Sequence, residues 1–321
     1  EKYSKEMNQY ADNYLAEKKI EDQFYKVVSQ MTRSFSPEPV ILAIQRANHW
    51  KGTSVRYKVF LTTLHIYYGF NTGDYERIIK NGESAIEMLK DKKGVYNTQY
   101  HSFFKDVGVA QMATGQYIKA QKSLERSANY VSKKSYNSYL LQFYSAMNLL
   151  RAGCYQKAFN LYQQHKNCHY EKIRRQFAII EAYLHFMVYT GRLKMNRPFR
   201  MRKFLNDTFN CRADKSGEGV TIIIAELLMY FAKDRGKFID RVDTVKNYSY
   251  QHLRGPETQR AKWFIRILCT LPRANFHPIA LTRLAKKQIE NLKVTSNGVG
   301  QNFAIEIIPF GDLLDMIMVD L

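Results

Sequence analysis

The stretch FKDVGVAQMATGQYIKAQKSLERS, residues 104–127, consists of two segments of helical character separated by a glycine. Apolar or small residues recur every three or four positions before Gly115 and again after Tyr117, which is the spacing of one buried helix face. Glycine tolerates the left-handed backbone that commonly ends a helix, and Tyr117 follows two positions later. The stretch therefore predicts two antiparallel helices joined by a tight turn.

The same turn signature, a glycine followed two residues later by an aromatic or aliphatic residue, recurs along the chain. Successive glycines are 42, 38, 38 and 45 residues apart. Self-similarity at such a period indicates a chain of repeated helical hairpins. The glycines are Gly73, Gly115, Gly153, Gly191 and Gly236. We expect a left-handed or tight turn at each of them.

Two of these copies resemble the tetratricopeptide repeats, a family of helical hairpins with Gly-x-Tyr at the turn and small residues in both helices. The best copy contains Phe104, Val107, Gly108, Gln111, Gly115, Tyr117, Ala120, Leu124 and Ser127. Another contains Ala146, Leu149, Gly153, Tyr155, Ala158 and Tyr162. The spacing exceeds the family's usual period of about 34 residues, so some helices or loops must be extended. In this interpretation Gly108 and Ala120 are small because two helices cross closely there.

The resemblance covers residues 54–250, strongly in two copies and weakly in three, and it implies an all-α solenoid of antiparallel helix hairpins wound into a superhelix. We expect about five repeats in this range. Residues 1–53 are predicted to form N-terminal helices that pack on the solenoid. Residues 251–321 are predicted to form a helical pair and a capping tail, in which residues 303–308 are extended and residues 311–321 form an acidic helix.

The net charge of +20 is concentrated in the middle of the chain. Residues 101–293 contain 34 Lys and Arg against 13 Asp and Glu, whereas residues 294–321 contain no basic residue and 4 acidic ones. A field of this sign attracts acidic proteins, nucleic acid or an anionic membrane surface. The composition therefore predicts an acidic partner without specifying which kind.

The spacing of the cysteines favours a reducing compartment, and we expect a cytoplasmic location. The cysteines lie far apart and form no C-x-x-C pair, which argues against a disulfide framework and a cysteine zinc site. They are Cys154, Cys168, Cys211 and Cys269. The longest apolar run, residues 220–232, contains Glu226 and falls short of the roughly 20 residues that span a bilayer. It predicts a buried helix and no membrane span.

The most basic segment is GRLKMNRPFRMRK, residues 191–203, with six Arg or Lys and no acid. Pro198 suits a first helical turn, and helical spacing would bring Arg200 and Lys203 together while Arg202 points elsewhere. Two interpretations remain open: a surface that contacts anions, or a solvated helix face. The predicted basic ridge consists of Arg174, Arg175, Arg192, Lys194, Arg197, Arg200, Arg202 and Lys203.

The resemblance also implies a concave groove lined by the first helix of each repeat. Its predicted lining includes Tyr67, Phe70, Lys105, Met112, Phe143, Met147 and His185. Only Lys105 suits a clamp for a terminal carboxylate, so such a clamp is not expected. Either the groove is open and accepts a helical or extended peptide, or a tightly wound superhelix fills its own groove. The second interpretation is slightly favoured.

No catalytic, cofactor or metal site is predicted. His165, Cys168 and His169 have helical spacing, but a zinc site needs a further ligand that the sequence does not supply. No zinc-protease motif, nucleophile elbow or phosphate-binding glycine loop occurs.

The sequence therefore predicts a non-catalytic binding or scaffold protein, not an enzyme, that recognises an acidic protein or peptide partner through a helical solenoid with a basic surface. The alternatives are sequence-independent binding of RNA or DNA through the basic ridge, and a sensor module of a larger regulator. The sequence does not determine the oligomeric state.

Overall fold

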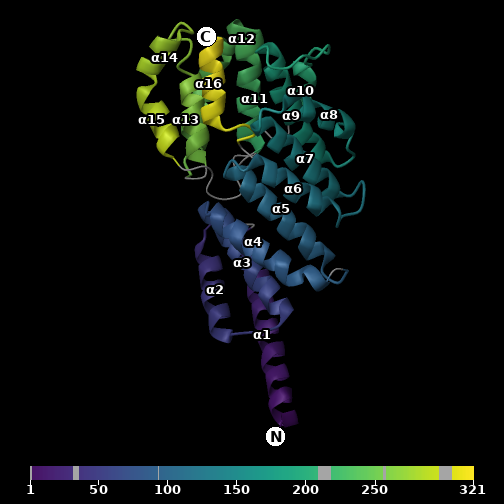
Figure 1. Ribbon diagram of the computed structural model, residues 1–321. Coiled ribbons are helices and arrows are strands. Elements are labelled where there is room, and N and C mark those ends of the chain that lie inside the picture. The colour runs from purple at the N-terminus through teal and green to yellow at the C-terminus, as the bar shows by residue number, and fades with distance from the viewer. Residues whose placement is uncertain (1, 32–35, 93, 209–217, 256–257, 296–305) are drawn as a thin grey trace. The chain divides into compact units, whose positions relative to one another are not determined.

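The computed structural model describes residues 2–31, 36–92, 94–208, 218–255, 258–295 and 306–321. Every regular element in these ranges is a helix and none is a strand, which confirms the predicted all-α class. Contacts divide the chain into two units, residues 1–131 and 132–321 (Figure 1). The boundary between the units falls inside the range for which the sequence predicts continuous repeats.

The first unit is a series of helices in which neighbours in sequence pack on one another. Its elements are α1 (Lys2–Met31), α2 (Glu38–Trp50), α3 (Val55–Thr72), α4 (Tyr75–Leu89), η1 (Lys90–Lys92), α5 (Asn97–Ala113) and α6 (Tyr117–Ala128). Helix α1 contacts both α2 and α3, and each helix from α3 to α5 contacts the next one along the chain.

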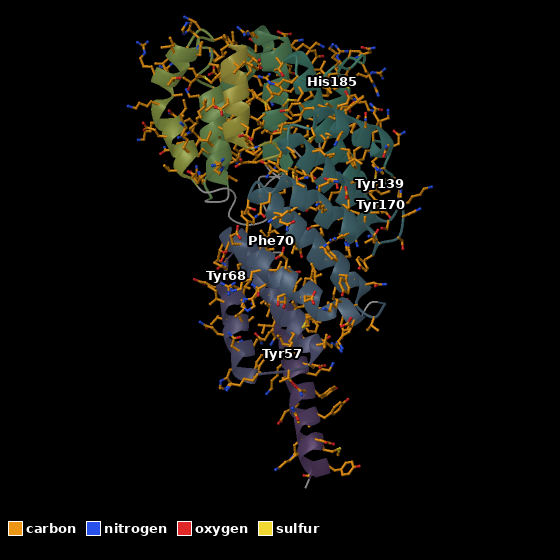
Figure 2. The ribbon with its side chains drawn as sticks, in the orientation of Figure 1. Tyr57, Tyr68, Phe70, Tyr139, Tyr170 and His185 are labelled. Carbon is orange, nitrogen blue, oxygen red and sulfur yellow. The ribbon has the colours of Figure 1, made fainter. Side chains whose placement is uncertain are left out.

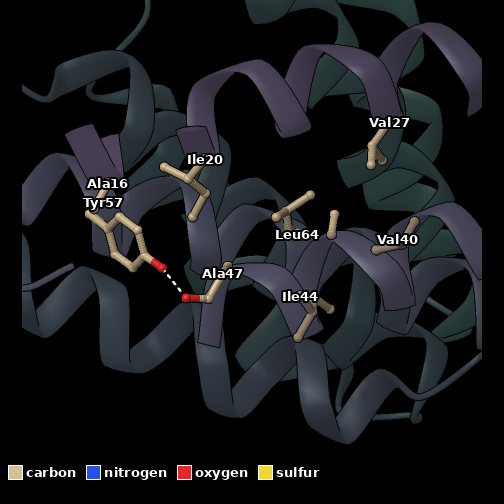
Figure 3. Packing of buried hydrophobic residues seen from close by; sticks show 9 residues of the cluster. Ala16, Ile20, Val27, Val40, Ile44, Ala47, Tyr57 and Leu64 are labelled. Carbon is tan, nitrogen blue, oxygen red and sulfur yellow. Dashed lines mark hydrogen bonds between the residues drawn. The ribbon is translucent and has the colours of Figure 1, made fainter. Parts of the chain in front are cut away.

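The N-terminal helices share one apolar core with α3 (Figure 3). Ile20 of α1, Ala47 of α2 and Leu64 of α3 are fully buried in it. The hydroxyl of Tyr57 donates a hydrogen bond to the Ala47 carbonyl across this core. Ser54 caps α3 by accepting the Tyr57 amide at 3.1 Å, as its position before the helix predicts. Helices α1 and α2 therefore pack on the first helix of the predicted repeat region.

The second unit contains the remaining helices. They are α7 (Tyr136–Arg151), α8 (Tyr155–His165), α9 (Glu171–Tyr189), α10 (Met201–Asp207), α11 (Glu218–Lys233), α12 (Arg235–His252), α13 (Gln259–Leu268), α14 (Pro278–Leu284), α15 (Lys286–Val294) and α16 (Phe310–Asp320). Helix α9 contacts α7, α8, α10 and α11, and α13 contacts α11, α12, α15 and α16. Helices α9 and α13 are therefore each surrounded by several neighbours.

The apolar run at residues 220–232 lies within α11, almost all of which is buried. The predicted buried helix is confirmed. The one acidic side chain of the run 220–232, Glu226, is only 3% exposed and pairs with Arg241 of α12 at 3.3 Å. A buried carboxylate requires such a partner, because an unpaired charge in the interior is strongly destabilising.

Four of the predicted glycine turns have the same backbone geometry. The φ angles are 73° at Gly73, 76° at Gly115, 71° at Gly153 and 72° at Gly191. At each turn, the amide of the residue after the glycine bonds to a carbonyl five residues earlier, at 2.8 or 2.9 Å. This is the Schellman helix end, which satisfies carbonyls that a helix end leaves unpaired. The prediction of left-handed glycines is confirmed at these four turns.

The fifth glycine, Gly236, behaves differently: of the predicted left-handed or tight turn, only a tight connection, between α11 and α12, is found. Helix α12 already begins at Arg235, and the Asp234 side chain caps it by accepting the Lys237 amide at 3.1 Å. Gly236 therefore lies in the first helical turn and has no positive φ. The Asp234 side chain thus satisfies an amide at the start of α12, and the Asp234 amide donates to the Tyr230 carbonyl at the end of α11 at 2.7 Å.

Helices α5 and α6 cross closely at Gly108, as the sequence predicts. A Cβ atom added to Gly108 would lie 3.0 Å from Cγ of Leu124 and 3.3 Å from the Ala120 carbonyl oxygen. Ala120 and Leu124 are themselves buried. The small residue at position 108 therefore reflects the distance between the two backbones.

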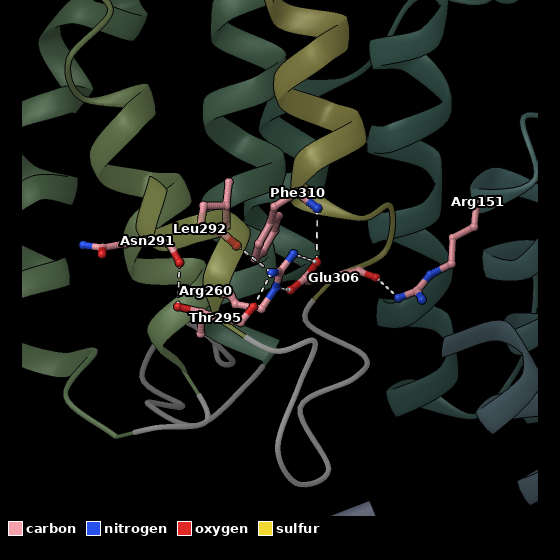
Figure 4. Close-up of polar contacts among 7 residues, drawn as sticks. All are labelled: Arg151, Arg260, Asn291, Leu292, Thr295, Glu306 and Phe310. Carbon is pink, nitrogen blue, oxygen red and sulfur yellow. Dashed lines mark hydrogen bonds and ion pairs between the residues drawn. The ribbon is translucent and has the colours of Figure 1, made fainter. Parts of the chain in front are cut away.

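Within the second unit, a polar network links the C-terminal segment to α7, α13 and α15 (Figure 4). Arg260 pairs with the Glu306 carboxylate and donates to the Leu292 carbonyl at 2.8 Å. Glu306 Oε2 also accepts the Phe310 amide at 3.1 Å, so this acid caps α16. Arg151 donates to the Glu306 carbonyl. The predicted helix at residues 311–321 is confirmed as α16, whereas residues 303–305 lie outside the described ranges and residues 306–308 form no strand.

Candidate anion-binding recess

A recess of about 550 Å³ lies on the second unit between the end of α8, the first half of α9, and residues 197–207. We call it the basic recess. Its charged side chains are Lys166, Arg174, Glu181, Arg197, Arg200, Lys203 and Asp207. Four members of the predicted basic ridge therefore line one concavity.

Helix α9 supplies one wall of the basic recess. Arg174, Ala178 and Glu181 line it at positions i, i+4 and i+7, which lie on one face of a helix. Phe177 contributes from the same turn and is 1% exposed. The helical repeat thus brings a cation, a small residue and an acid onto the same wall.

The opposite wall is formed by residues 197–207. Helix α10 begins at Met201 with Arg200 as its N-cap, so Pro198 precedes the helix and the prediction of a first-turn proline is wrong. The reason is tertiary, because buried Phe199 packs against the His185 ring at 5.1 Å and so holds this segment on α9. Arg200 and Lys203 line the recess from one face of α10, and Arg202 does not.

The floor of the basic recess is aromatic but mostly covered. Phe199 and Phe204 are 6% and 4% exposed, so their rings give the floor rigidity and little apolar surface. The hydroxyl of Tyr162 shares a hydrogen bond with the Glu181 carboxylate. Burial, followed by this neighbouring carboxylate, raises the pKa of Tyr162, so the phenol is neutral at physiological pH. Glu181 is therefore already engaged by the protein.

The recess has an excess of positive charge, with five Lys or Arg side chains against two acidic ones. Within the described ranges, no ion pair engages Arg174, Arg197, Arg200 or Lys203. Like charges that outnumber the neighbouring acids create a positive potential that attracts anions.

The pKa of buried His185, whose ring packs against Phe199, is lowered partly by nearby positive charge. Burial lowers its pKa to about 4, and the positive charges of Arg197 and Lys233 contribute in the same direction. The imidazole is therefore neutral at physiological pH.

The other four residues of the predicted basic ridge lie outside the recess lining. Arg192 forms an ion pair with Asp320 at 2.9 Å. Arg175 pairs with Glu171 at 2.6 Å and approaches Glu218 at 3.7 Å. Lys194 and Arg202 are exposed. The structure thus divides the ridge into recess cations, paired cations and exposed cations.

Most residues of the predicted groove are packed in the interior. Met112, Phe143, Met147 and His185 are each no more than 2% exposed. These side chains cannot contact a peptide while they keep this packing.

Of the remaining groove residues, all in the first unit, Lys105 and Tyr67 are also engaged by the chain. Lys105 pairs with Asp106 at 2.8 Å, and the Tyr67 ring stacks on Phe24 of α1 at 5.9 Å. Phe70 is half-buried (Figure 2). We therefore base no binding site on the predicted groove.

Sequence reasoning missed Lys166, His169 and Asp207 as parts of the recess. Asp207 lies seven positions after Arg200, and this helical spacing is a signal that was available. Lys166 and His169 gave no such signal, since their place depends on how the connection from α8 to α9 folds back beside α10.

The rings of His165 and His169 both pack edge-on against Tyr139, at 5.9 and 5.8 Å. Tyr170 meets the same ring at 6.0 Å (Figure 2). Cys168 is buried, which raises the pKa of its thiol. Across the described parts of the chain, no group of three or more His, Cys, Asp or Glu side chains is arranged to hold a metal ion.

A second cationic surface lies where α12 meets α13. The Arg266 guanidinium lies over the Tyr250 ring at 4.4 Å and over the Trp263 ring at 5.2 Å. The Lys262 ammonium lies 5.9 Å from the Trp263 ring centroid. Burial, then the nearby charges of Arg266 and Arg254, lower the pKa of Lys262. We call these five side chains the cation–aromatic cluster.

Comparisons with known proteins identify no relative: no family model, curated protein or solved structure matches this chain. Among the helices that the structure describes, none is long and apolar enough to span a membrane.

Proposed function

We propose that this chain is a non-catalytic binding protein that holds an acidic protein or peptide at the basic recess. The observation that carries the proposal is the convergence of Arg174, Arg197, Arg200 and Lys203 on one concavity without ion pairs to described residues. We also propose that its hairpins belong to a tetratricopeptide-like solenoid, which the four matching glycine turns support.

The rigidity of the recess favours recognition by a preformed surface. Phe177, Phe199 and Phe204 are buried beneath the charged side chains and fix the elements that bear them. Arginine is suited to such a site, because its planar fork binds a carboxylate through two parallel hydrogen bonds. A partner therefore meets cations whose supporting backbone is already in place, which reduces the entropy lost on binding.

The test is fluorescence anisotropy of a fluorescein-labelled polyglutamate peptide titrated with the full chain. The recess variant is Arg197→Glu/Arg200→Glu, and the matched control is Lys194→Glu/Arg202→Glu, which makes the same charge change at exposed sites outside the recess. We expect the recess variant to lose binding by much more than the control. Equal losses in two folded variants would contradict the proposal and indicate attraction to net charge alone.

The cation–aromatic cluster favours a second candidate function, sequence-independent binding of single-stranded nucleic acid. Bases stack on aromatic rings while neighbouring cations contact the phosphates. Tyr250 is 52% exposed and is the most accessible ring of the cluster.

The second candidate is tested with labelled single-stranded RNA at about 50 and about 200 mM salt. Phosphate contacts predict a steep loss of affinity with salt, and stacking predicts a loss on Tyr250→Leu/Trp263→Leu. Salt-steep binding that this variant leaves unchanged would locate the RNA elsewhere.

A further inference from the structure

We propose that the basic recess recognises a phosphomonoester, specifically a phosphorylated side chain of the partner. This inference rests on the proposed function and narrows it from acidic ligands in general to one anionic group.

The recess cations are several and come from separate segments of the chain. Arg174 projects from α9, Arg197 from the irregular segment before α10, and Arg200 and Lys203 from the start of α10. Cations on two facing walls suit a tetrahedral group with three acceptor oxygens better than a planar carboxylate with two. Phosphate accepts hydrogen bonds from several arginines at once, and such charge-assisted bonds are among the strongest in proteins.

The recess also has a large excess of positive charge. The recess contains five cationic and two acidic side chains, and one acid, Glu181, is hydrogen-bonded to Tyr162. A phosphomonoester has a charge of about −1.5 to −2 at neutral pH, whereas a carboxylate has −1. The dianion therefore compensates more of the excess in the same space.

The two acidic side chains of the recess disfavour a continuous polyanion as its ligand. Glu181 lies on the α9 wall, and exposed Asp207 lies at the other end of the α10 face from Arg200. A continuous nucleic-acid backbone passing through the recess would bring phosphates close to these carboxylates, at a repulsive cost. A single phosphoryl group on a flexible chain occupies the cationic part alone. The arrangement thus favours a phosphorylated peptide over a polyanion.

The volume is consistent with this ligand. At about 550 Å³ the recess is far larger than one phosphoryl group and leaves room for the side chain that bears it. The exposed lining is mostly polar because the aromatic floor is covered, so affinity must come chiefly from the anion.

The test is isothermal titration calorimetry of the full chain with four small probes: the N-acetyl amides of phosphotyrosine, phosphoserine, sulfotyrosine and glutamate. Sulfotyrosine is tetrahedral but singly charged, so it separates shape from charge. We expect either phosphoamino acid to bind at least about tenfold more tightly than sulfotyrosine or glutamate. Comparable affinity of all four probes would overturn the inference.

Two variants locate the site. Arg197→Gln/Arg200→Gln should weaken phosphoamino-acid binding by about tenfold to a hundredfold, because each lost charge-assisted contact weakens the complex. Lys194→Gln/Arg202→Gln, with the same loss of charge outside the recess, should change it less than about twofold. Equal effects of the two variants would overturn the inference. Far-UV circular dichroism confirms that both fold.

Failure of this inference differs from failure of the proposed function. If the polyglutamate peptide binds in a recess-dependent way and the phosphoamino acids bind no better than glutamate, only the phosphate inference fails. If neither class depends on the recess cations, both proposals fail. If single-stranded RNA requires Arg197 and Arg200 and displaces the phosphoamino acids, the site is a nucleic-acid site and the inference is overturned.

Discussion

The Arg192 guanidinium donates to both carboxylate oxygens of Asp320, at 3.1 and 2.9 Å, and to the Met316 carbonyl at 3.3 Å. Arg192 follows the glycine turn at the end of α9, and Asp320 is the last residue of α16. A residue of the most basic segment of the chain thus holds the acidic C-terminal helix. Positive charge in this segment therefore has a structural use at Arg192, a few residues before the recess cations.

This ion pair predicts a measurable coupling between the two side chains. Both are 21% exposed, so a double-mutant cycle of Arg192→Gln and Asp320→Asn should give a coupling energy of about 0.5–1 kcal/mol in urea unfolding. Asp315→Asn, an exposed acid of the same helix, is the control and should show no coupling to Arg192→Gln. A cycle that closes with no coupling energy would show that the pair does not stabilise α16.

Arg260 and Glu306 form a more buried pair, with side chains 12% and 11% exposed. Arg260→Met should destabilise the second unit by about 3–5 kcal/mol, since it leaves the Glu306 carboxylate buried without its cation. Arg260→Met/Glu306→Gln should recover part of this loss, because the neutral amide costs less to bury.

Thermal unfolding measures the stability of these variants, and hydrogen exchange of α16 amides reports where protection is lost. Arg283→Met, at an exposed position on α14, is the control and should leave both unchanged. Stability of Arg260→Met equal to that of this control would contradict the assigned role.

The glycine turns predict position-dependent effects of alanine. Gly115 and Gly153 have φ angles of 76° and 71° with no atom within 4 Å of an added Cβ, so alanine there should cost about 1–2 kcal/mol through backbone strain alone. Gly236 lies in a helical turn, so Gly236→Ala should be neutral or stabilise by up to about 1 kcal/mol. Chemical denaturation compares the three variants, and equal losses at all three positions would refute this explanation.

His185 predicts a loss of stability in acid. Its pKa falls from 6.5 to about 4 in the folded chain, so the unfolded state binds the proton first as the pH decreases. The free energy of unfolding should therefore decrease between about pH 6.5 and pH 4, by about 3 kcal/mol from this residue.

The check is urea unfolding at a series of pH values for the wild type, His185→Leu and the exposed control His169→Gln. His185→Leu should flatten the dependence in this window, whereas His169→Gln should retain it. An unchanged slope in His185→Leu would assign the acid sensitivity to other groups.

The sequence predicted four of the basic residues that line the candidate site, but not how most of the basic ridge is placed or paired. The helical spacing of the basic segment indicated that Arg200 and Lys203 share a face and that Arg202 does not. In the structure Arg200 and Lys203 line the recess, and Arg202 lies outside its lining. The sequence could not show that Arg192 would be paired, since Asp320 lies 128 residues away. It also misplaced the start of α10, because the contact of Phe199 with His185 overrides the local preference of Pro198.

Local sequence was enough to predict the helical class, four of the glycine turns, the buried helix at residues 220–232 and the close crossing at Gly108. These features depend on local spacing and on the backbone freedom of glycine, which neighbours in sequence already define. By contrast, packing between helices sets which cations are paired, which are exposed and which line the basic recess. Apart from the local pair of Arg175 with Glu171, that outcome depends on contacts between residues far apart in the chain, for which a charged side chain carries no local signal.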